Sequence, residues 1–242
     1  MTKVKVTGLC HSVQHTAKML ADWIHTPMDR VSYLCAGINH QAFYLKFEVD
    51  GRDAYPMIRE AVGCPQVYKE EQVRNELFLH LDYYPTESSG HNSEYYPWFR
   101  KRKDLLETYC THSTGWNPGA HAYILNEYFR RANEWKKDIQ DWLVKDQVDL
   151  ERGQEYAACI FNALFGDQEP YTFNGNVRNE QHITNLPDGC CVEVPVTVDA
   201  KGFHVQTVGN LPDHLAMLIH TAEKTYQVDF TAPLSPEVSV RV

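Results

Sequence analysis

Hydrophobic and polar positions follow the period of a helix in some stretches of the chain and that of a strand in others. After Ser12, apolar residues recur every three or four positions, which predicts a helix that Pro27 ends. Further helical patterns occupy parts of 56–80, with a break at 63–65, and the ranges 101–107, 121–144 and 154–165. Strand patterns occupy 3–9, 31–35, 43–49, 191–198 and 203–208.

These elements indicate a single mixed domain. The clearest helical pattern runs from His121 to Val144 and places its apolar residues on one face of one expected helix. The dipeptide Asp50-Gly51 marks a hairpin turn after the strand predicted over 43–49. Without an internal repeat or a low-complexity linker, the pattern predicts an α+β fold in which helices pack on an antiparallel sheet.

Composition and charge narrow the class of protein without naming an activity. Hydrophobic residues make up 43% of the 242 residues and charged residues 23%, which is typical of globular proteins. The net charge of −9 argues against nucleic acids and anionic membranes as partners, since both favour a basic surface. The sequence shows no secretory signal, no apolar run of membrane length and no CxxC among its seven cysteines, so we expect a cytoplasmic protein.

Cys10 and His40 occupy positions that suggest chemistry. Cys10 lies between a predicted strand and the helix that begins at Ser12, where backbone N–H groups point outward, and His40 follows a strand in the segment GINH. A thiol and an imidazole together indicate a mixed sulfur–nitrogen site for a transition metal, with positions left open for substrate. A buried free cysteine and a structural histidine remain the alternative interpretation.

The aromatic segment SEYYPWF, at 93–99, also has two interpretations. The rings belong to the core or to a subunit interface, or they form walls for a sugar while Tyr95 acts as a base near a metal. The segment 173–195 is rich in asparagine, which binds sugar hydroxyls but more often forms turns. The thirteen glycines include no GxG, so the sequence has no phosphate-cradling loop of the Rossmann or P-loop type.

Motifs in a fixed order resemble glycoside hydrolase family 4, in its α-galactosidase (melibiase-like) branch. From about Lys3 to Leu218 they are GLCHSVQ, GINHQAFYL, the dipeptide YP at 55–56, SEYYPWF, ITNLP and VEVP. The resemblance implies the C-terminal domain of a lactate/malate dehydrogenase-like architecture. It also implies hydrolysis of α-galactosides with NAD and a divalent metal, usually manganese, by oxidation, elimination, addition of water and reduction.

The resemblance further implies roles for single residues. Cys10 and His40 match the metal ligands, and Tyr95 matches the base that removes the C2 proton. Asn39 is expected to contact the substrate beside the metal. His11 stands where related branches carry an aspartate proposed as the acid for leaving-group departure, a task that a histidinium can also perform.

Residues 1–242 are therefore expected to form the metal- and substrate-binding domain, with the Rossmann NAD domain absent and a divergent tail at 221–242. Family members are usually dimers or tetramers, and the aromatic-rich region 109–142 is a candidate interface of a homo-oligomer. Two other hypotheses are a catalytically inactive, truncated remnant of such an enzyme and a conventional hydrolase with paired carboxylates. The second rests on Glu48/Asp50 or Glu94/Asp104, pairs that no spacing distinguishes.

Overall fold

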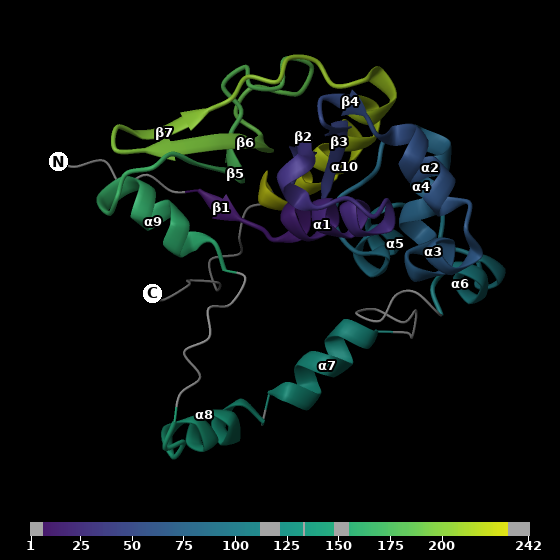
Figure 1. The fold of residues 1–242 in the computed structure, drawn as a ribbon. Helices are drawn as coiled ribbons and strands as arrows, with labels where there is room; N and C mark the ends of the chain where they lie inside the picture. The colour runs from purple at the N-terminus through teal and green to yellow at the C-terminus, as the bar shows by residue number, and fades with distance from the viewer. Residues whose placement is uncertain (1–6, 112–121, 133, 148–154, 232–242) are drawn as a thin grey trace.

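The computed structural model describes residues 7–111, 122–132, 134–147 and 155–231, in which helices cover an antiparallel sheet of seven strands (Figure 1). The order across the sheet is β1-β5-β6-β2-β3-β4, and β7 pairs with β6. The strands are β1 (Gly8–Leu9), β2 (Val31–Ile38), β3 (Gln41–Val49), β4 (Arg52–Asp53), β5 (Tyr171–Arg178), β6 (Cys191–Asp199) and β7 (Gly202–Val205). The helices are α1 (Ser12–Trp23), α2 (Tyr55–Val62), α3 (Pro65–Glu70), α4 (Gln72–Leu81), α5 (Ser89–Tyr95), α6 (Lys103–Tyr109), α7 (Tyr123–Arg131), α8 (Trp135–Leu143), α9 (Ala157–Phe165) and α10 (Asp213–Thr231), and Met28–Arg30 form a 3-10 turn.

The two faces of the sheet are covered by different helices. Tyr44 of β3 packs with Val13 and Ala17 of α1, so we call this side the α1 face. Val194 of β6 packs with Leu215 of α10 on the other side. Successive side chains of a strand point to opposite faces, so Ala42 and Tyr44 of β3 lie on the α1 face and Phe43 on the other, and a register shift between β2 and β3 at Leu34 and Cys35 interrupts this alternation.

Most predicted elements are present, and the fold class is α+β as predicted. α1 begins at Ser12, β2 and β3 contain the strands predicted over 31–35 and 43–49, and the chain turns at Asp50-Gly51 between β3 and β4. The helical stretch 56–80 is divided into α2, α3 and α4, and α2 ends at Val62 before the predicted break. Of the strand predicted over 3–9, residues 8–9 form β1, while 1–6 lie outside the described residues.

The helix predicted over 121–144 is wrong as a single element. The described part of this stretch forms two helices, α7 and α8, which project from the sheet (Figure 1), while residues 121 and 133 lie outside the description. Its apolar face is not buried, since Phe129 is 67% exposed and Trp142 is 64% exposed. The spacing of apolar positions correctly indicated an apolar face, but no element within the described residues buries this face.

The asparagine-rich segment 173–195 is divided between strands and turns. Residues Tyr171–Arg178 form β5, a strand paired on both sides, while 179–190 form turns and bends in which the Asn179 side chain donates to the carbonyls of Ile183 and Leu186. Asn174 stays in the buried strand because its side-chain amide donates to the carbonyl of Cys35 at 2.9 Å.

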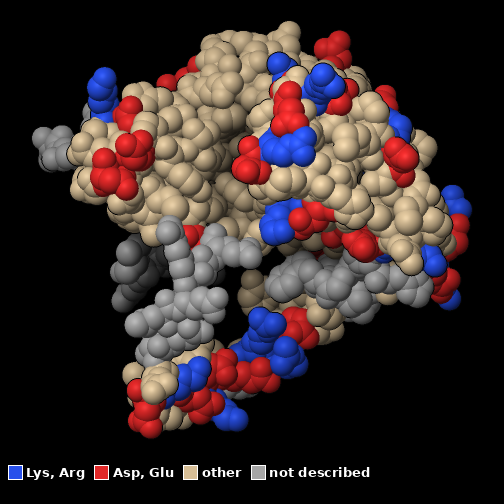
Figure 2. Space-filling view, viewed as in Figure 1, with Lys and Arg blue, Asp and Glu red and all other residues tan. Residues whose placement is uncertain are grey.

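Surface charge is mixed on the face shown in Figure 2. Lys and Arg stand among Asp and Glu there, and α7 and α8 carry both signs, as in the pairs of Arg130 with Glu127 and Glu134. Within the described ranges, every helix is too short or too polar to span a lipid bilayer.

Candidate metal centre

Cys10 follows the short strand β1 and precedes α1, as the sequence predicted. Its thiol donates to the hydroxyl of Ser12 at 3.2 Å. Its carbonyl accepts a hydrogen bond from the Tyr156 hydroxyl at 2.9 Å, which ties this turn to the segment in front of α9. Both ends of the residue are therefore held, and the sulfur atom has a defined position.

His40 lies in the tight turn that joins β2 to β3, and its φ of 65° places it in the left-handed region. Such a conformation is uncommon for a residue with a side chain and is concentrated at functional sites. The Nδ1 atom lies 3.0 Å from the hydroxyl of Tyr95, and the ring stacks on His91 with a centroid distance of 5.2 Å. These contacts orient the ring so that Nε2 points away from Tyr95.

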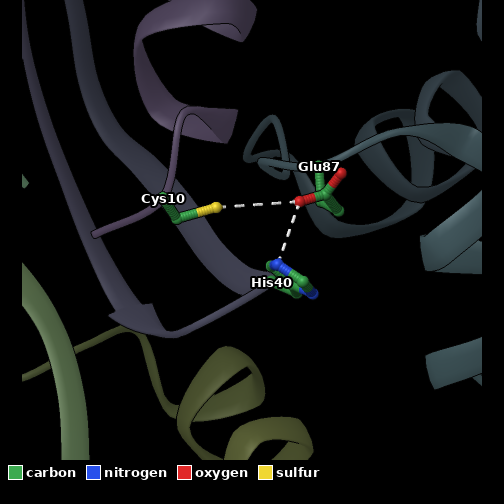
Figure 3. A group of neighbouring side chains, drawn as sticks. All are labelled: Cys10, His40 and Glu87. Carbon is green, nitrogen blue, oxygen red and sulfur yellow. Dashed lines mark hydrogen bonds and ion pairs between the residues drawn. The ribbon is translucent and has the colours of Figure 1, made fainter. Parts of the chain in front are cut away.

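Glu87 completes a group of three candidate ligands and was not singled out from the sequence. Its Oε2 atom lies 3.3 Å from Nε2 of His40 and 4.0 Å from Sγ of Cys10 (Figure 3). Its other oxygen accepts a hydrogen bond from the backbone N–H of Ser88 at 3.1 Å. Glu87 also has a left-handed backbone conformation, with φ of 70°. This conformation costs free energy for a residue with a side chain, and it orients the carboxylate toward Cys10 and His40.

The donor set fits a divalent transition metal. One atom each from Cys10, His40 and Glu87 lies within 4.8 Å of the other two. Ligand atoms around a tetrahedral metal at roughly 2.0–2.3 Å stand about 3–4 Å apart, so little movement is needed. Thiolate, imidazole and carboxylate all bind divalent first-row metals, and the bond between Tyr95 and Nδ1 leaves Nε2 free to serve as the ligand.

The remaining predicted residues lie around this group but not in it. His11 pairs with Glu155, with 3.0 Å between Nε2 and Oε2, and 37% of its side chain is exposed. Asn39 precedes His40 in the turn between β2 and β3, and its side chain is exposed. The structure thus brings Cys10, His40 and Tyr95 together, while Asn39 is exposed and the ring of His11 is paired with Glu155.

Two cavities flank the group. One of about 410 Å³ is lined by Cys10, His11 and Glu87, and reaches the buried Arg74. The other, of about 630 Å³, is lined by Tyr95 together with residues of α5 and α7. Both fall in the range of about 300–1,000 Å³ that small-molecule sites occupy.

Two curated proteins that match nearly the whole chain are named alpha-galactosidase. The chain is 36% identical over 241 residues to an alpha-galactosidase of Bacillus subtilis (strain 168), covering 97% of this chain and 53% of that protein. It is 29% identical over 243 residues to an alpha-galactosidase of Rhizobium meliloti (strain 1021), covering 98% of this chain and 49% of that protein. The chain spans about half the length of the curated relatives it matches.

Solved structures share the fold. LplD of Bacillus subtilis, described as a supposed glucosidase, superposes with a TM-score of 0.75 at 22% identity, covering 93% of this chain and 54% of that one. A 6-phospho-beta glucosidase from Thermotoga maritima, solved with manganese, NAD+ and glucose-6-phosphate, gives a TM-score of 0.62 at 20% identity, covering 92% and 49%. Residues 35–234 match the family described as the Family 4 glycosyl hydrolase C-terminal domain, and the chain belongs to that family.

Proposed function

We propose that this chain is the metal- and substrate-binding domain of an α-galactosidase that uses NAD and a divalent metal, with manganese as the first choice. The observation that carries the proposal is the convergence of Cys10, His40 and Glu87, with Tyr95 hydrogen-bonded to His40. The two alpha-galactosidase relatives support the substrate class. The Thermotoga maritima neighbour, solved with manganese and NAD+, supports the cofactors.

The residues divide the work as follows. When bound, the metal polarises a sugar oxygen as a Lewis acid, and NAD accepts and returns a hydride. Cys10, His40 and Glu87 hold the metal, and their combined negative charge offsets its positive charge. Tyr95 removes the proton at C2 of the sugar, because its hydroxyl stands one hydrogen bond from the ligand His40.

The substrate is proposed to bind at the metal group, between the 410 Å³ cavity lined by Cys10 and Glu87 and the 630 Å³ cavity lined by Tyr95. His11 lines the cavity of Cys10 and Glu87, pairs with Glu155 and is placed to give a proton to the leaving oxygen. Asn39 is proposed to contact a sugar hydroxyl beside the metal. These assignments predict that His11→Ala impairs poor leaving groups more than the activated p-nitrophenolate.

We also propose that the protein is a cytoplasmic homo-oligomer with no nucleic-acid or membrane partner. The exposed apolar side chains of α7 and α8 support a subunit contact, since large exposed apolar surfaces mark interaction sites in soluble proteins. The net charge of −9 supports the absence of polyanionic partners.

The proposal is tested by hydrolysis of p-nitrophenyl α-galactoside by the chain with NAD+, Mn2+ and a reductant, and with each omitted in turn. Activity that requires both additions is expected, together with its loss in Cys10→Ser. Cys64→Ser is the matched control, because Cys64 is an exposed thiol outside the site. Activity that persists without NAD+ would refute the mechanism.

A separate measurement of Mn2+ binding by calorimetry divides the remaining outcomes. Metal binding without turnover, even when NAD+ is present, favours the inactive-remnant hypothesis. Hydrolysis that needs neither metal nor NAD+ favours the paired-carboxylate hydrolase.

A further inference from the structure

Glu193 is a buried carboxyl group that the proposed mechanism does not use. It lies in the middle of β6, has no exposed surface, and neither of its side-chain oxygens has a hydrogen-bond partner within the described part of the chain. Leaving a buried polar group without a partner costs about 1–3 kcal/mol, more for a charged group. Native proteins therefore leave few such groups, and each one calls for a missing partner such as a water or an ion.

The position of Glu193 in the sheet places it between the strands that carry the metal ligands. Gly8, Asn176, Glu193 and Gly37 stand opposite one another in a row across β1, β5, β6 and β2. Residues directly opposite in an antiparallel sheet point to the same face, so Asn176 and Glu193 are neighbours on that face. The row lies on the α1 face, because Gly37 is paired with Ala42, which packs with α1.

The two ligands leave the sheet at the two ends of this row. Cys10 is two residues beyond Gly8, and His40 is three residues beyond Gly37. Their strands, β1 and β2, are separated by β5 and β6, yet their ligand atoms meet within 4.8 Å. They can meet only over the strands between them, where the row presents Asn176 and Glu193.

The pKa of Glu193 also reflects its proximity to the metal group. Burial raises the pKa of Glu193 to about 8; the negative groups of Cys10 and Glu87 add to the rise, and His40 opposes it. All three members of the metal group therefore act on this carboxyl. The side-chain oxygen of Asn176 is also buried without a partner, so a second group in the row lacks a hydrogen-bond donor.

We propose that Glu193 is a positioning residue of the metal centre, whose carboxyl accepts a hydrogen bond from a water or hydroxyl that the divalent ion holds. The inference rests on the metal site of the proposed function. Glu193 lies in the row of the sheet between the strands that lead to Cys10 and His40, and it would fix an oxygen on the metal, as carboxylates near metal ligands do elsewhere. Its unpaired oxygens gain a donor when the ion and its bound oxygen arrive.

The test measures Mn2+ affinity of the full chain by calorimetry and by electron paramagnetic resonance of free Mn2+. The variants are Glu193→Gln, which keeps the shape and removes the charge, and Glu193→Asp, which keeps the carboxyl on a shorter arm. Glu169→Gln is the matched control, because Glu169 is exposed and lies in the connection between α9 and β5, outside the metal group. Glu193→Gln is expected to bind Mn2+ about 10–100-fold more weakly, and Glu193→Asp to lose less.

The melting temperature without metal separates a positioning role from a structural one. Glu193→Gln is expected to melt no lower than the unsubstituted chain when no metal is present, and to gain less on addition of Mn2+. Equal Mn2+ affinity in Glu193→Gln and Glu169→Gln would overturn the inference alone, whereas no Mn2+ binding by the unsubstituted chain would overturn the proposed metal site and the inference with it. If Glu193→Gln does not fold, Glu193→Asp decides, because affinity equal to that of the control would contradict a positioning role.

Discussion

Tyr95→Phe removes one atom from the candidate metal centre and tests the contact that joins it to the proposed base. The hydroxyl lies 3.0 Å from Nδ1 of His40, in a half-buried position, and phenylalanine keeps the ring in place. Two losses are expected because the hydroxyl has two proposed tasks. It orients the imidazole of His40, and it removes a proton from the sugar.

The expected sizes of these losses differ. A neutral hydrogen bond contributes about 1 kcal/mol net, and partners behind a metal ligand change metal affinity about 10–100-fold. A single neutral bond points to the lower end, about tenfold in the dissociation constant of Mn2+, or about 1.4 kcal/mol. Loss of the base adds a further factor of about 10²–10⁴ in turnover at saturating metal.

The neighbouring Tyr96 provides the control. It is 3% exposed, and its hydroxyl is buried without a hydrogen-bond partner in the described structure. Tyr96→Phe therefore removes an unsatisfied group, and unfolding by urea is expected to show unchanged or slightly greater stability. Mn2+ affinity and turnover should match those of the unsubstituted chain.

The reasoning about Tyr95 is refuted if Tyr95→Phe binds Mn2+ as tightly as Tyr96→Phe does. It is refuted in its second part if turnover falls only as far as the metal affinity falls, since saturating Mn2+ would then restore full activity. Calorimetry for affinity and release of p-nitrophenol at saturating Mn2+ distinguish the two results.

Other features give further expected outcomes. Leu20 is fully buried in α1, so Leu20→Ala should lower the free energy of unfolding in urea by about 2–5 kcal/mol. Lys18→Ala breaks an exposed ion pair with Asp22 and should change this free energy by less than about 1 kcal/mol. In metal-free protein the folded chain retains the Glu193 proton up to about pH 8, above the unfolded value of 4.5. Its contribution to stability should therefore fall by about 1.4 kcal/mol per pH unit as pH rises between these values, and pH-dependent melts of Glu193→Gln should lack that slope. Trp142→Lys should reduce the mass measured by light scattering if α8 forms the subunit contact, and leave the circular dichroism unchanged.

Local pattern predicted the elements whose apolar faces are covered within the chain. The period after Ser12 predicts α1 because Val13, Ala17 and Leu20 all pack against the sheet. The same kind of period over 121–144 predicted one helix, yet two helices with exposed faces are present. An amphipathic period indicates that one face of a helix is apolar and favours burial. It does not indicate which element buries that face or where the helix ends.

The candidate site shows a similar division. Cys10, His40 and Tyr95 were predicted from motifs in the sequence, and the structure brings them together. Glu87 lies in a serine-rich loop whose composition indicates only a turn. Its role depends on a left-handed backbone conformation that the neighbouring residues do not predict. Glu193 was visible as the glutamate of VEVP, but its significance comes from its lack of partners, which is a property of the folded chain.

The short strand β1 gives the metal centre a second consequence. Among the residues that the structure describes from position 7 onward, β1 pairs with β5 through Gly8 and Leu9 alone, so few of their backbone hydrogen bonds hold the segment that delivers Cys10. A metal bound to Cys10, His40 and Glu87 would tie this weakly held segment to two distant parts of the chain. By linkage, metal at a hundred times its dissociation constant stabilises the bound form by about 2.7 kcal/mol. Amide hydrogen exchange in β1 should then slow about a hundredfold. The exchange rate at this edge of the sheet therefore reports how much of the protein has metal bound.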